Sequence, residues 1–501
     1  MARIQLKAAA TVVGHAASRR LVRGYIRRRI NVITASPPEL STLVEHLVAV
    51  KPDLRPQEIG PRTSLTRDLG FDSLDLVRLA ARIHEQHPEA DLTPWLAGAC
   101  QAGADSVGSM ADHLARARRR DYVALARELA PAFAERAARH DADGGFPHEN
   151  LAELVRTGYT AMTIPREYGG DGAGLGELCE AQQVLAGACA STAFSVNMHV
   201  HGLAMIAQLG GQDAEWVCRA VSEGAVIAGG FSEPGVGGNW WHPTTKAERV
   251  DGGYVLNGRK GFFTGFPGAT HLFLSAATKD DRGLPQPMAF LVPKPDEGIR
   301  VIEEWDAAGM RATGSHTLAI EDFFVEDRWS VGEPGKLPLL FMTGVHWAWC
   351  SFASVFVGIA RAALEHVTAT QRRRVLSVIG KPNAHLPGVQ FRVAEMATRL
   401  AAARAHLEAA VHADHDTAGP IAHYLDMSLM KMQVTRLAHE VVTLGMQVQG
   451  GSSLVSASPL QRMYRDVIAG LLVPPAADVV LEWAGKHALD VPIFAEPRWA
   501  E

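Results

Sequence analysis

The 501-residue sequence predicts a mainly α-helical protein with one central β segment. Apolar residues recur at helical spacing in much of the N-terminal part, and again over Ala/Leu/Val/Met-rich stretches between about residues 337 and 489. Between residues 225 and 329 the pattern changes to short strands separated by turn signals, as in VDGGYVLNGRK and LFLSAAT. We therefore expect helices, then strands, then helices, in about three domains.

Shifts in composition divide the chain into five segments. Ser36-Pro37-Pro38 marks the end of a basic arm, because serine followed by proline is typical of the start of a helix. The basic run Arg116–Arg120 is expected to be a linker between two helical segments. The expected segments are the basic arm at 1–36, a helical domain at 37–118, a second helical domain at 121–224, a β domain at 225–335 and a third helical domain at 337–490.

The bulk composition argues against several classes of protein. The net charge of −5 gives no electrostatic reason to expect nucleic-acid binding. The five cysteines are far apart and contain no C-x-x-C pair, so we expect neither a disulfide framework nor a metal site, which fits the reducing cytoplasm. No run reaches the roughly 18 consecutive apolar residues of a membrane helix, so no transmembrane segment is expected.

The basic arm permits two interpretations. Eight lysines and arginines precede the first acidic residue, Glu39, and six of them are arginines between Arg19 and Arg29. This composition is typical of a disordered or loosely docked arm. The apolar residues of the arm recur at helical spacing, however, which would give an amphipathic helix that docks on a partner enzyme or an anionic surface. The arm lacks the apolar core and cleavage site of a secretory signal.

The string TSLTRDLGFDSLDLVRLAARI predicts a loop that ends at Asp72 and an amphipathic helix that begins at Ser73. Leu74, Val77 and Leu79 are available for a core beneath this helix. Serine is a preferred helix cap, so capping alone would account for Ser73. Capping does not account for the rest of the string.

The segment from about Pro37 to Leu114 resembles acyl carrier and peptidyl carrier proteins, which are four-helix bundles. The resemblance implies that Ser73 carries covalent 4′-phosphopantetheine. A flexible thioester arm would keep a substrate attached while it reaches a buried site, which raises the effective concentration of that substrate. The expected partners are a phosphopantetheinyl transferase and an acyl- or aminoacyl-loading enzyme or synthase module.

Residues 121 to about 490 resemble the acyl-CoA dehydrogenase family at several separated places in the right order. The strings that carry the resemblance are FPHENLAELVRTGYTAMTIPREYGGDGAG, GGFSEPGVGGN, NGRKGFFTG, GMRATGSHTLAIEDFFV, GIARAALEHV, IGKPNAHLPGVQFRVAEMA and MQVQGGSSLVSASPLQRMYRD. The resemblance implies an N-terminal α domain, a middle β-barrel and a C-terminal four-helix bundle. It also implies a FAD-dependent oxidoreductase that forms a homodimer or homotetramer, because family members complete the FAD site across subunits.

The resemblance assigns four residues to the flavin ring. Phe262, Phe263 and Thr264 stand where the family has Trp-Ile-Thr/Ser. The aromatic ring would pack on the flavin, and the Thr264 hydroxyl would hydrogen-bond near the reactive nitrogen. Ser232 stands where the family has a threonine at the pyrimidine edge, and a neutral donor there would stabilise charge on the reduced flavin.

Four further residues are assigned to the remainder of the FAD. Arg374 fits the arginine that binds the pyrophosphate, and Gln447, Gly450 and Gly451 fit the Q-x-x-G-G turn that approaches the FAD of a neighbouring subunit. Arginine suits phosphate, and glycine suits close approach of the backbone to a cofactor. Each feature alone also has a plain structural explanation, as a turn or as a solvated arginine.

The family pattern breaks at the catalytic base. Members that desaturate a thioester use a glutamate to take the α-proton, usually shortly after Y-R-D or, in some members, in the long helix before G-I-A-R-A. Those positions are Pro474 and Ala348 in this sequence, and neither side chain accepts a proton. Both usual positions of the base are therefore empty.

Other residues are candidates for the base. His346 lies about one helical turn before Trp349, and an unperturbed histidine pKa of about 6.5 permits proton exchange near neutrality. A buried, hydrogen-bonded structural histidine is the alternative interpretation of His346. Asp478 and Glu482 on the following helix offer carboxylates, although spacing alone does not show whether either points at the flavin.

Three functions are consistent with these features. The first is an oxidoreductase that acts on an acyl group carried by its own carrier domain, including hydroxyacyl or aminoacyl thioesters, in the biosynthesis of specialised metabolites such as antibiotics. The second is an oxygen-using flavin oxidase or monooxygenase, since members that activate oxygen commonly lack the glutamate. The third is a non-catalytic carrier scaffold, which the retained flavin-site residues make less attractive.

Overall fold

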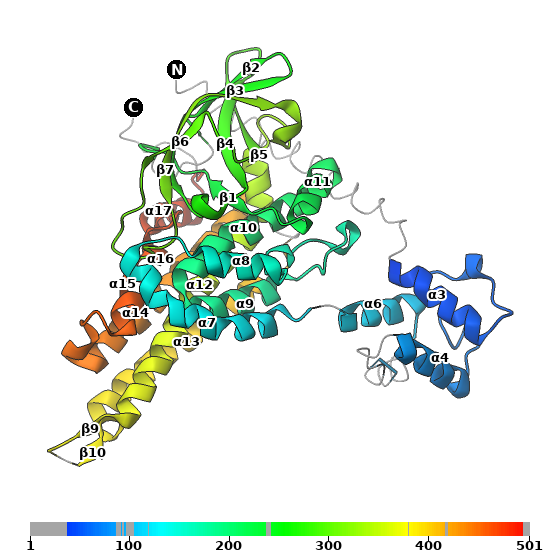
Figure 1. The fold of residues 1–501 in the computed structure, drawn as a ribbon, viewed down its shortest axis with the longest axis horizontal. Helices are drawn as coiled ribbons and strands as arrows, with labels where there is room; N and C mark the ends of the chain where they lie inside the picture. The colour runs from blue at the N-terminus through cyan, green and yellow to red at the C-terminus, as the bar shows by residue number, and fades with distance from the viewer. Residues whose placement is uncertain are drawn as a thin grey trace. The chain divides into compact units, whose positions relative to one another are not determined.

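The structure is a computed structural model, and it describes residues 38–86, 92, 95–96, 105–118, 120–236, 242–378, 380–415 and 419–493. The chain forms two compact units, Met1–Asp121 and Tyr122–Glu501 (Figure 1). The basic arm expected at 1–36 lies outside the described residues.

The first unit is a small helical bundle. Its described α-helices are α3 (Pro38–Val50), α4 (Ser73–Gln86) and α6 (Val107–Arg118). The apolar faces of these helices share one core, whose most buried members include Leu43, Leu47, Leu65, Leu79, Ile83 and Val107. The long loop between α3 and α4 is fixed to the start of α6, because Asp105 accepts hydrogen bonds from the Ser64 hydroxyl and the Thr66 N–H, each at 2.9 Å.

Helices open the second unit, as the sequence predicts. They are α7 (Tyr122–Asp143), α8 (His148–Arg156), α9 (Leu175–Ala188), α10 (Ala190–Leu209) and α11 (Gly211–Ser222). Most residues of α10 are buried, because this helix contacts α9, α11, the first strand β1 (Ile227–Gly230) and the C-terminal helix α12 (Leu337–Arg373). A helix that is apolar on nearly every side belongs inside a larger core.

The strands of the second unit form one twisted sheet. They are β1 (Ile227–Gly230), β2 (Lys246–Val250), β3 (Gly253–Phe263), β4 (His271–Lys279), β5 (Pro285–Pro293), β6 (Ile299–Glu303), β7 (His316–Glu326) and β8 (Ser330–Val331). The hydrogen-bonded order is β6-β7-β3-β2-β4-β5-β8, and β1 pairs parallel to β4. An isolated bridge between Gly229 and Thr264 also joins β1 to the residue that follows β3.

Helices close the second unit, which confirms the predicted order of helices, strands and helices. They are α12 (Leu337–Arg373), α13 (Pro387–Val411), α14 (Pro420–Gln449), α15 (Pro459–Val467), α16 (Ala469–Leu472) and α17 (Ala477–Ala488). A two-stranded hairpin of β9 (Val375–Leu376) and β10 (Lys381–Pro382) connects α12 to α13. The long helices α12 and α14 pack along each other and supply much of the main core.

Two stretches reach the length and apolar content of a membrane span, Leu337–Arg373 and Pro459–Ala488. In the first, 78% of the most apolar window is buried against other helices, as in the core helix of a globular domain. The structure divides the second stretch into α15, α16 and α17.

Candidate functional site

Ser73 is the first residue of α4 and is exposed. The cap of this helix is Asp72, whose Oδ1 accepts the Leu74 N–H at 2.9 Å and the Asp75 N–H at 2.8 Å. Capping by Ser73 is therefore not what the structure shows, and among the described residues the Ser73 hydroxyl has no hydrogen-bond partner. A hydroxyl in this position is open to a modifying enzyme.

The surface beside Ser73 is apolar. Leu74 is 56% exposed and Val77 is 62% exposed, so the expectation that they enter the core is wrong, whereas Leu79 is fully buried. Lys51 fixes the loop before Ser73, because its ammonium donates to the Gly70 carbonyl and pairs with Asp75 at 3.1 Å. The serine therefore lies on a fixed loop–helix junction with exposed apolar side chains next to it.

The end of β3 separates the two phenylalanines of the GFFTG string. Phe262 has a positive φ of 54° and is 65% exposed, and the register of β3 against β7 shifts between Lys260 and Phe263. A left-handed backbone is uncommon for a bulky residue and requires support from its surroundings. The irregularity turns Phe262 outward, which suits an aromatic side chain that packs on a ligand.

Phe263 is a core residue. Its side chain is fully buried, and its Cδ2 atom lies 2.0 Å from the position that a Cβ atom on Gly230 would occupy. Glycine is therefore required at the end of β1 beneath this ring. The expectation that Phe263 contacts the cofactor is corrected, since its ring packs into the sheet core with Phe266.

Thr264 belongs to a chain of hydroxyl groups. Its Oγ1 lies 2.9 Å from Ser315 Oγ, and Ser315 Oγ lies 2.7 Å from Thr313 Oγ1. Thr313 Oγ1 donates in turn to the Met310 carbonyl at 3.0 Å. All three hydroxyl side chains are buried, so this chain fixes the direction of the Thr264 hydroxyl.

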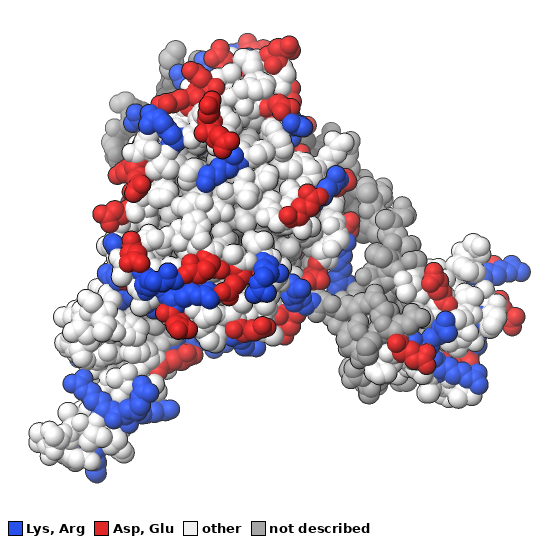
Figure 2. All heavy atoms as spheres, in the orientation of Figure 1, with Lys and Arg blue, Asp and Glu red and all other residues white. Residues whose placement is uncertain are grey.

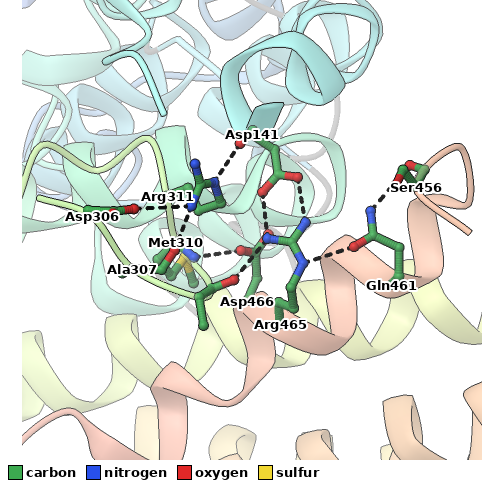
Figure 3. A network of polar contacts seen from close by, with 10 residues as sticks. Asp141, Asp306, Ala307, Met310, Arg311, Ser456, Gln461, Arg465 and Asp466 are labelled. Carbon is green, nitrogen blue, oxygen red and sulfur yellow. Dashed lines mark hydrogen bonds and ion pairs between the residues drawn. The ribbon is translucent and has the colours of Figure 1, made fainter. Parts of the chain in front are cut away.

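The loop between β6 and β7 supports both Phe262 and Thr264. Trp305 in this loop packs edge-on against Phe262 with ring centroids 5.9 Å apart, and its indole N–H donates to the Met310 carbonyl at 2.8 Å. The Met310 N–H donates to the buried Asp466 carboxylate at 2.6 Å (Figure 3). Burial raises the pKa of Asp466 to about 6, although the Met310 N–H opposes this shift.

Arg465 joins the same loop to α7. Its guanidinium pairs with Asp141 through two nitrogens and donates to the Ala308 carbonyl at 2.8 Å (Figure 3). Gly309 passes so close that a Cβ atom there would lie 1.9 Å from the Arg465 carbonyl oxygen. The R-D pair of the sequence therefore anchors the loop that supports the end of β3.

A buried ion pair, which the sequence analysis missed, lies beneath Ser232. Lys260 Nζ lies 2.5 Å from Glu233 Oε1, with both side chains at most 1% exposed, and donates to Ser275 Oγ at 3.0 Å. Glu233 also accepts hydrogen bonds from the Oγ1 hydroxyl and from the backbone N–H of Thr245. Burial lowers the pKa of Lys260 to about 8, and the attraction of Glu233 opposes that shift. The alternation of side chains along β3 could have revealed that Lys260 is buried, because Leu256 and Lys260 lie on the same face of the strand.

Ser232 itself stands at the edge of this arrangement. Its carbonyl accepts the Gly261 N–H at 2.9 Å, which joins the segment after β1 to the end of β3. Its side chain is half-buried, and its hydroxyl has no hydrogen-bond partner among the described residues. Ser232, Phe262 and Thr264 thus lie on neighbouring backbone segments, as a flavin ring requires.

Arg374 and the glycine turn lie together at the other end of the unit. Arg374 follows α12 and donates to Ser452 Oγ at 3.4 Å, next to Gly450 and Gly451. Gly450 has a φ of +67°, and a Cβ atom on either glycine would meet open space. Gln447 also lies here, where its Oε1 accepts a hydrogen bond from Arg392 at 2.7 Å.

The charge at this end suits an anion. No acidic residue occurs between Glu365 and Glu395, and Arg374 makes no salt bridge within the described part of the chain. Figure 2 shows lysines and arginines gathered where Figure 1 draws β9 and β10. The exposed basic residues of this region are Arg372, Arg373, Arg374 and Lys381. These residues fit the phosphates of a dinucleotide.

One chain does not bring the two sets of residues together. The ring-side residues lie at the end of β3, next to β1, whereas β9 and β10 lie at the end of the second unit that points away from the sheet (Figure 1). The predicted cofactor residues therefore form two half-sites, one suited to a ring system and one suited to phosphate.

The two positions at which the sequence comparison with the family predicts a base, Ala348 and Pro474, hold no proton acceptor. Ala348 is buried in α12, and Pro474 lies in the turn before α17. Lys431 supports that turn, because its ammonium donates to the Val473 carbonyl and lies 3.4 Å from the Pro475 carbonyl. Burial lowers the pKa of Lys431 to about 7.

The alternative carboxylates are on the surface. Asp478 is exposed in the first turn of α17. Glu482, one turn later, is also exposed and pairs with Lys486 at 2.5 Å. Neither carboxylate lies in an enclosed environment.

His346 faces away from the end of β3. Phe341 and Phe352 on α12 pack against Phe231 and Phe194, whereas His346 packs against α14, where its Nδ1 lies 3.3 Å from His423 Nε2. Burial, together with the two neighbouring histidines, lowers the pKa of His346 to about 3. This placement argues against the expected role of His346 as the base.

Family models match both units of the chain. The acyl-CoA dehydrogenase N-terminal, middle and C-terminal domain models match residues 116–222, 228–323 and 350–472. The phosphopantetheine attachment site model matches residues 43–94. The putative acyl-CoA dehydrogenase YdbM of Bacillus subtilis is 31% identical over 386 residues, which cover 74% of this chain and 98% of YdbM.

Solved structures with the same fold include several kinds of enzyme. Butyryl-CoA dehydrogenase from Megasphaera elsdenii aligns with a TM-score of 0.67 at 25% identity, over 74% of this chain and 98% of its own. A nitrososynthase from Micromonospora carbonacea aligns with a TM-score of 0.65 at 28% identity, over 74% and 96% of the two chains. FMN-bound TdsC from Paenibacillus aligns with a TM-score of 0.67 at 25% identity, over 75% and 99%.

Proposed function

Because the chain belongs to the acyl-CoA dehydrogenase family of flavoproteins and also contains a phosphopantetheine carrier domain, we propose that it oxidises an acyl group held as a thioester on its own Ser73. One observation carries this proposal. The same chain contains Ser73, exposed at the start of a helix, and the residues Phe262 and Thr264 at the end of β3, which are suited to hold a flavin ring. Covalent delivery supplies a high effective concentration without a binding site for coenzyme A.

The residues of the chain would hold the flavin in two parts. Phe262 would pack on the ring, and the fixed hydroxyl of Thr264 and the hydroxyl of Ser232 would hydrogen-bond to its polar edge. Arg374 and the Gly450–Gly451 turn would bind the phosphates. A bound flavin supplies two-electron chemistry. We propose FAD as this flavin, because the phosphate half-site suits a diphosphate.

We propose a homodimer or homotetramer for the same reason. The two half-sites lie apart within the second unit, one next to β1 and the other near β9 and β10, so a second copy would have to bring its phosphate half-site to the ring half-site of the first (Figure 1). Size-exclusion chromatography with light scattering measures the assembly directly. A FAD-loaded monomer would contradict this arrangement.

The empty base positions restrict the cargo. Pro474 and Ala348 take no proton, and the structure directs His346 toward α14. An acyl group whose reacting carbon is already acidic, or which bears a hydroxyl or amino group, needs only a weak base. We therefore propose hydroxyacyl or aminoacyl thioesters as cargo, in specialised-metabolite biosynthesis such as that of antibiotics.

The proposed partners follow from the carrier unit. A phosphopantetheinyl transferase would attach the arm to Ser73, and an acyl- or aminoacyl-loading enzyme or synthase module would charge it. The exposed Leu74 and Val77 offer these enzymes an apolar surface next to the serine. The cysteine pattern fits a cytoplasmic setting for these reactions.

A second candidate is an oxygen-using flavin enzyme. Two observations favour it, namely the empty base positions and the alignment with a nitrososynthase at 28% identity. Such an enzyme would consume NAD(P)H and oxygen and would form hydrogen peroxide or an oxygenated product.

Intact-protein mass spectrometry and anaerobic mixing test the proposal. The natively purified chain should gain the mass of one phosphopantetheine, Ser73→Ala should abolish this gain, and Ser377→Ala in the exposed hairpin turn should retain it. Anaerobic loading of the arm with a hydroxyacyl or aminoacyl group should bleach the flavin absorbance. Bleaching that occurs equally with Ser73→Ala and free acyl-CoA would overturn the tethered substrate.

A further inference from the structure

Three histidines from three separate segments converge in the second unit. His346 lies in α12, His415 lies in the connection between α13 and α14, and His423 lies in the first turn of α14. Their candidate ligand nitrogens all lie within 4.8 Å of one another. The cluster belongs to neither half of the flavin site, because His346 faces α14 and the phosphate half-site lies beyond the opposite end of that helix.

The spacing within the cluster matches a metal site. His346 Nδ1 and His423 Nε2 are 3.3 Å apart. Two nitrogens bound to one tetrahedral zinc ion at about 2.0–2.1 Å are separated by about 3.3–3.4 Å. This pair therefore already has the separation of two ligands of one ion.

The third ligand requires one local movement. The His415 ring is stacked on His346 with centroids 4.2 Å apart and an angle of 6° between the rings. A metal ion lies in the plane of each imidazole that binds it, and two stacked parallel planes do not share such a point. To become the third ligand, His415 must therefore rotate about its side-chain bonds.

The surroundings keep the cluster in the form that binds metal. His346 and His423 are buried and His415 is half-buried. Metals bind the neutral imidazole. Three histidines with an open fourth position are a known zinc ligand set, and imidazole also suits Cu²⁺, Ni²⁺ and Co²⁺.

We propose that His346, His415 and His423 form a binding site for one divalent transition-metal ion, with zinc as the expected occupant. The ion would connect α12, α14 and the connection that precedes α14. This site does not depend on the proposed function, since no residue of the flavin half-sites or of the carrier unit takes part. The absence of a C-x-x-C pair does not bear on this site, because its ligands are histidines.

Metal titration of the full-length protein, produced without a histidine tag, tests the proposal. After treatment with a chelator and dialysis, the protein should bind one Co²⁺ per chain with the visible absorption bands of a tetrahedral site, and Zn²⁺ should displace it. Zn²⁺ should also raise the melting temperature of the second unit. His415→Ala and His423→Ala should each weaken Co²⁺ binding at least tenfold. Even the loss of a residue that only hydrogen-bonds to a metal ligand lowers metal affinity by about 10–100-fold.

Two variants make the result specific. His412→Ala removes an exposed histidine three residues before His415 and should leave stoichiometry and affinity unchanged. His415→Asp replaces one ligand by another and should restore part of the affinity lost in His415→Ala. The proposal is overturned if the wild-type protein shows no tetrahedral Co²⁺ spectrum, or if His412→Ala and His415→Ala lose binding equally. Unchanged flavin content in His415→Ala would show that the variant is folded.

Discussion

The buried pair of Glu233 and Lys260 provides the sharpest test of how the end of β3 is held in place. Glu233→Gln keeps the shape of the side chain and removes its charge. The Lys260 ammonium then remains buried against Ser275 without a counter-ion. The hydrogen bonds from Thr245 change from charge-assisted bonds to neutral ones.

The expected loss of stability is large. Removal of one partner of a fully buried pair costs about 3–5 kcal/mol, because an uncompensated charge remains in the interior. The surface pair of Arg300 and Glu321 in the same sheet provides a matched control, since its atoms are 2.9 Å apart but both side chains are exposed. Glu321→Gln should cost at most about 1 kcal/mol.

The dependence on pH identifies the buried ammonium as the cause. Burial depresses the folded-state pKa of Lys260 to about 8, and Glu233 opposes that shift, so the pKa falls further in Glu233→Gln. The unfolded chain then binds more protons than the folded chain from this lower pKa up to the ordinary lysine value, and stability rises with pH across that window. Urea unfolding followed by circular dichroism should show a smaller deficit at pH 9 than at pH 7.

The double variant Glu233→Gln/Lys260→Met decides between this reasoning and a simple loss of packing. With both charges removed, the protein should be more stable than Glu233→Gln alone, and the two changes should couple strongly in a double-mutant cycle. Additive effects, or a deficit in Glu233→Gln no larger than that of Glu321→Gln, would refute the assignment. A deficit that grows between pH 7 and pH 9 would refute it as well.

Three further outcomes follow from the burial of single residues. Phe262→Ala should weaken flavin binding, measured by absorbance titration, with little change in the free energy of unfolding, because the Phe262 ring is exposed. Phe263→Ala should instead lower the free energy of unfolding by about 3–5 kcal/mol. Equal losses of stability in the two variants would contradict the separation of the two rings. Leu74→Ala should slow phosphopantetheine attachment in a mass-spectrometric time course without unfolding the carrier unit, because Leu74 is exposed. Leu79→Ala should instead destabilise that unit by about 2–5 kcal/mol, because Leu79 is buried. A normal attachment rate in folded Leu74→Ala would count against the docking of partner enzymes on Leu74 and Val77. Gly309→Ala should lower the melting temperature of the second unit, because the new Cβ atom would lie 1.9 Å from the Arg465 carbonyl oxygen. An unchanged melting temperature would show that the loop between β6 and β7 relaxes.

Periodicity and turn signals in the sequence were enough to predict the order of the elements. The alternation in VDGGYVLNGRK predicted β3, and the apolar stretches after residue 337 predicted α12 to α14. The loop before Ser73 and the helix that begins there were also predicted. These features arise from neighbouring residues, which a sequence records directly.

Features that depend on the orientation of side chains or on how the helices pack were missed. The cap at Asp72 depends on which of two adjacent side chains turns toward the backbone, and the exposure of Leu74 and Val77 depends on which helix face meets α3 and α6. The histidine cluster joins positions separated by 77 residues in sequence, with no spacing that marks a metal motif. Such contacts arise only when the helices pack.

The two departures from the family pattern acquire a common explanation under the proposed function. A substrate on a covalent arm needs no binding energy from coenzyme A to reach the flavin, so the body is free to lose contacts that serve free thioesters. A strong base is needed only where the carbon–hydrogen bond is weakly acidic. Under the proposed function, Pro474 and Ala348 would therefore restrict the enzyme to cargo whose own chemistry makes the proton easy to remove, and the carrier would determine which cargo arrives.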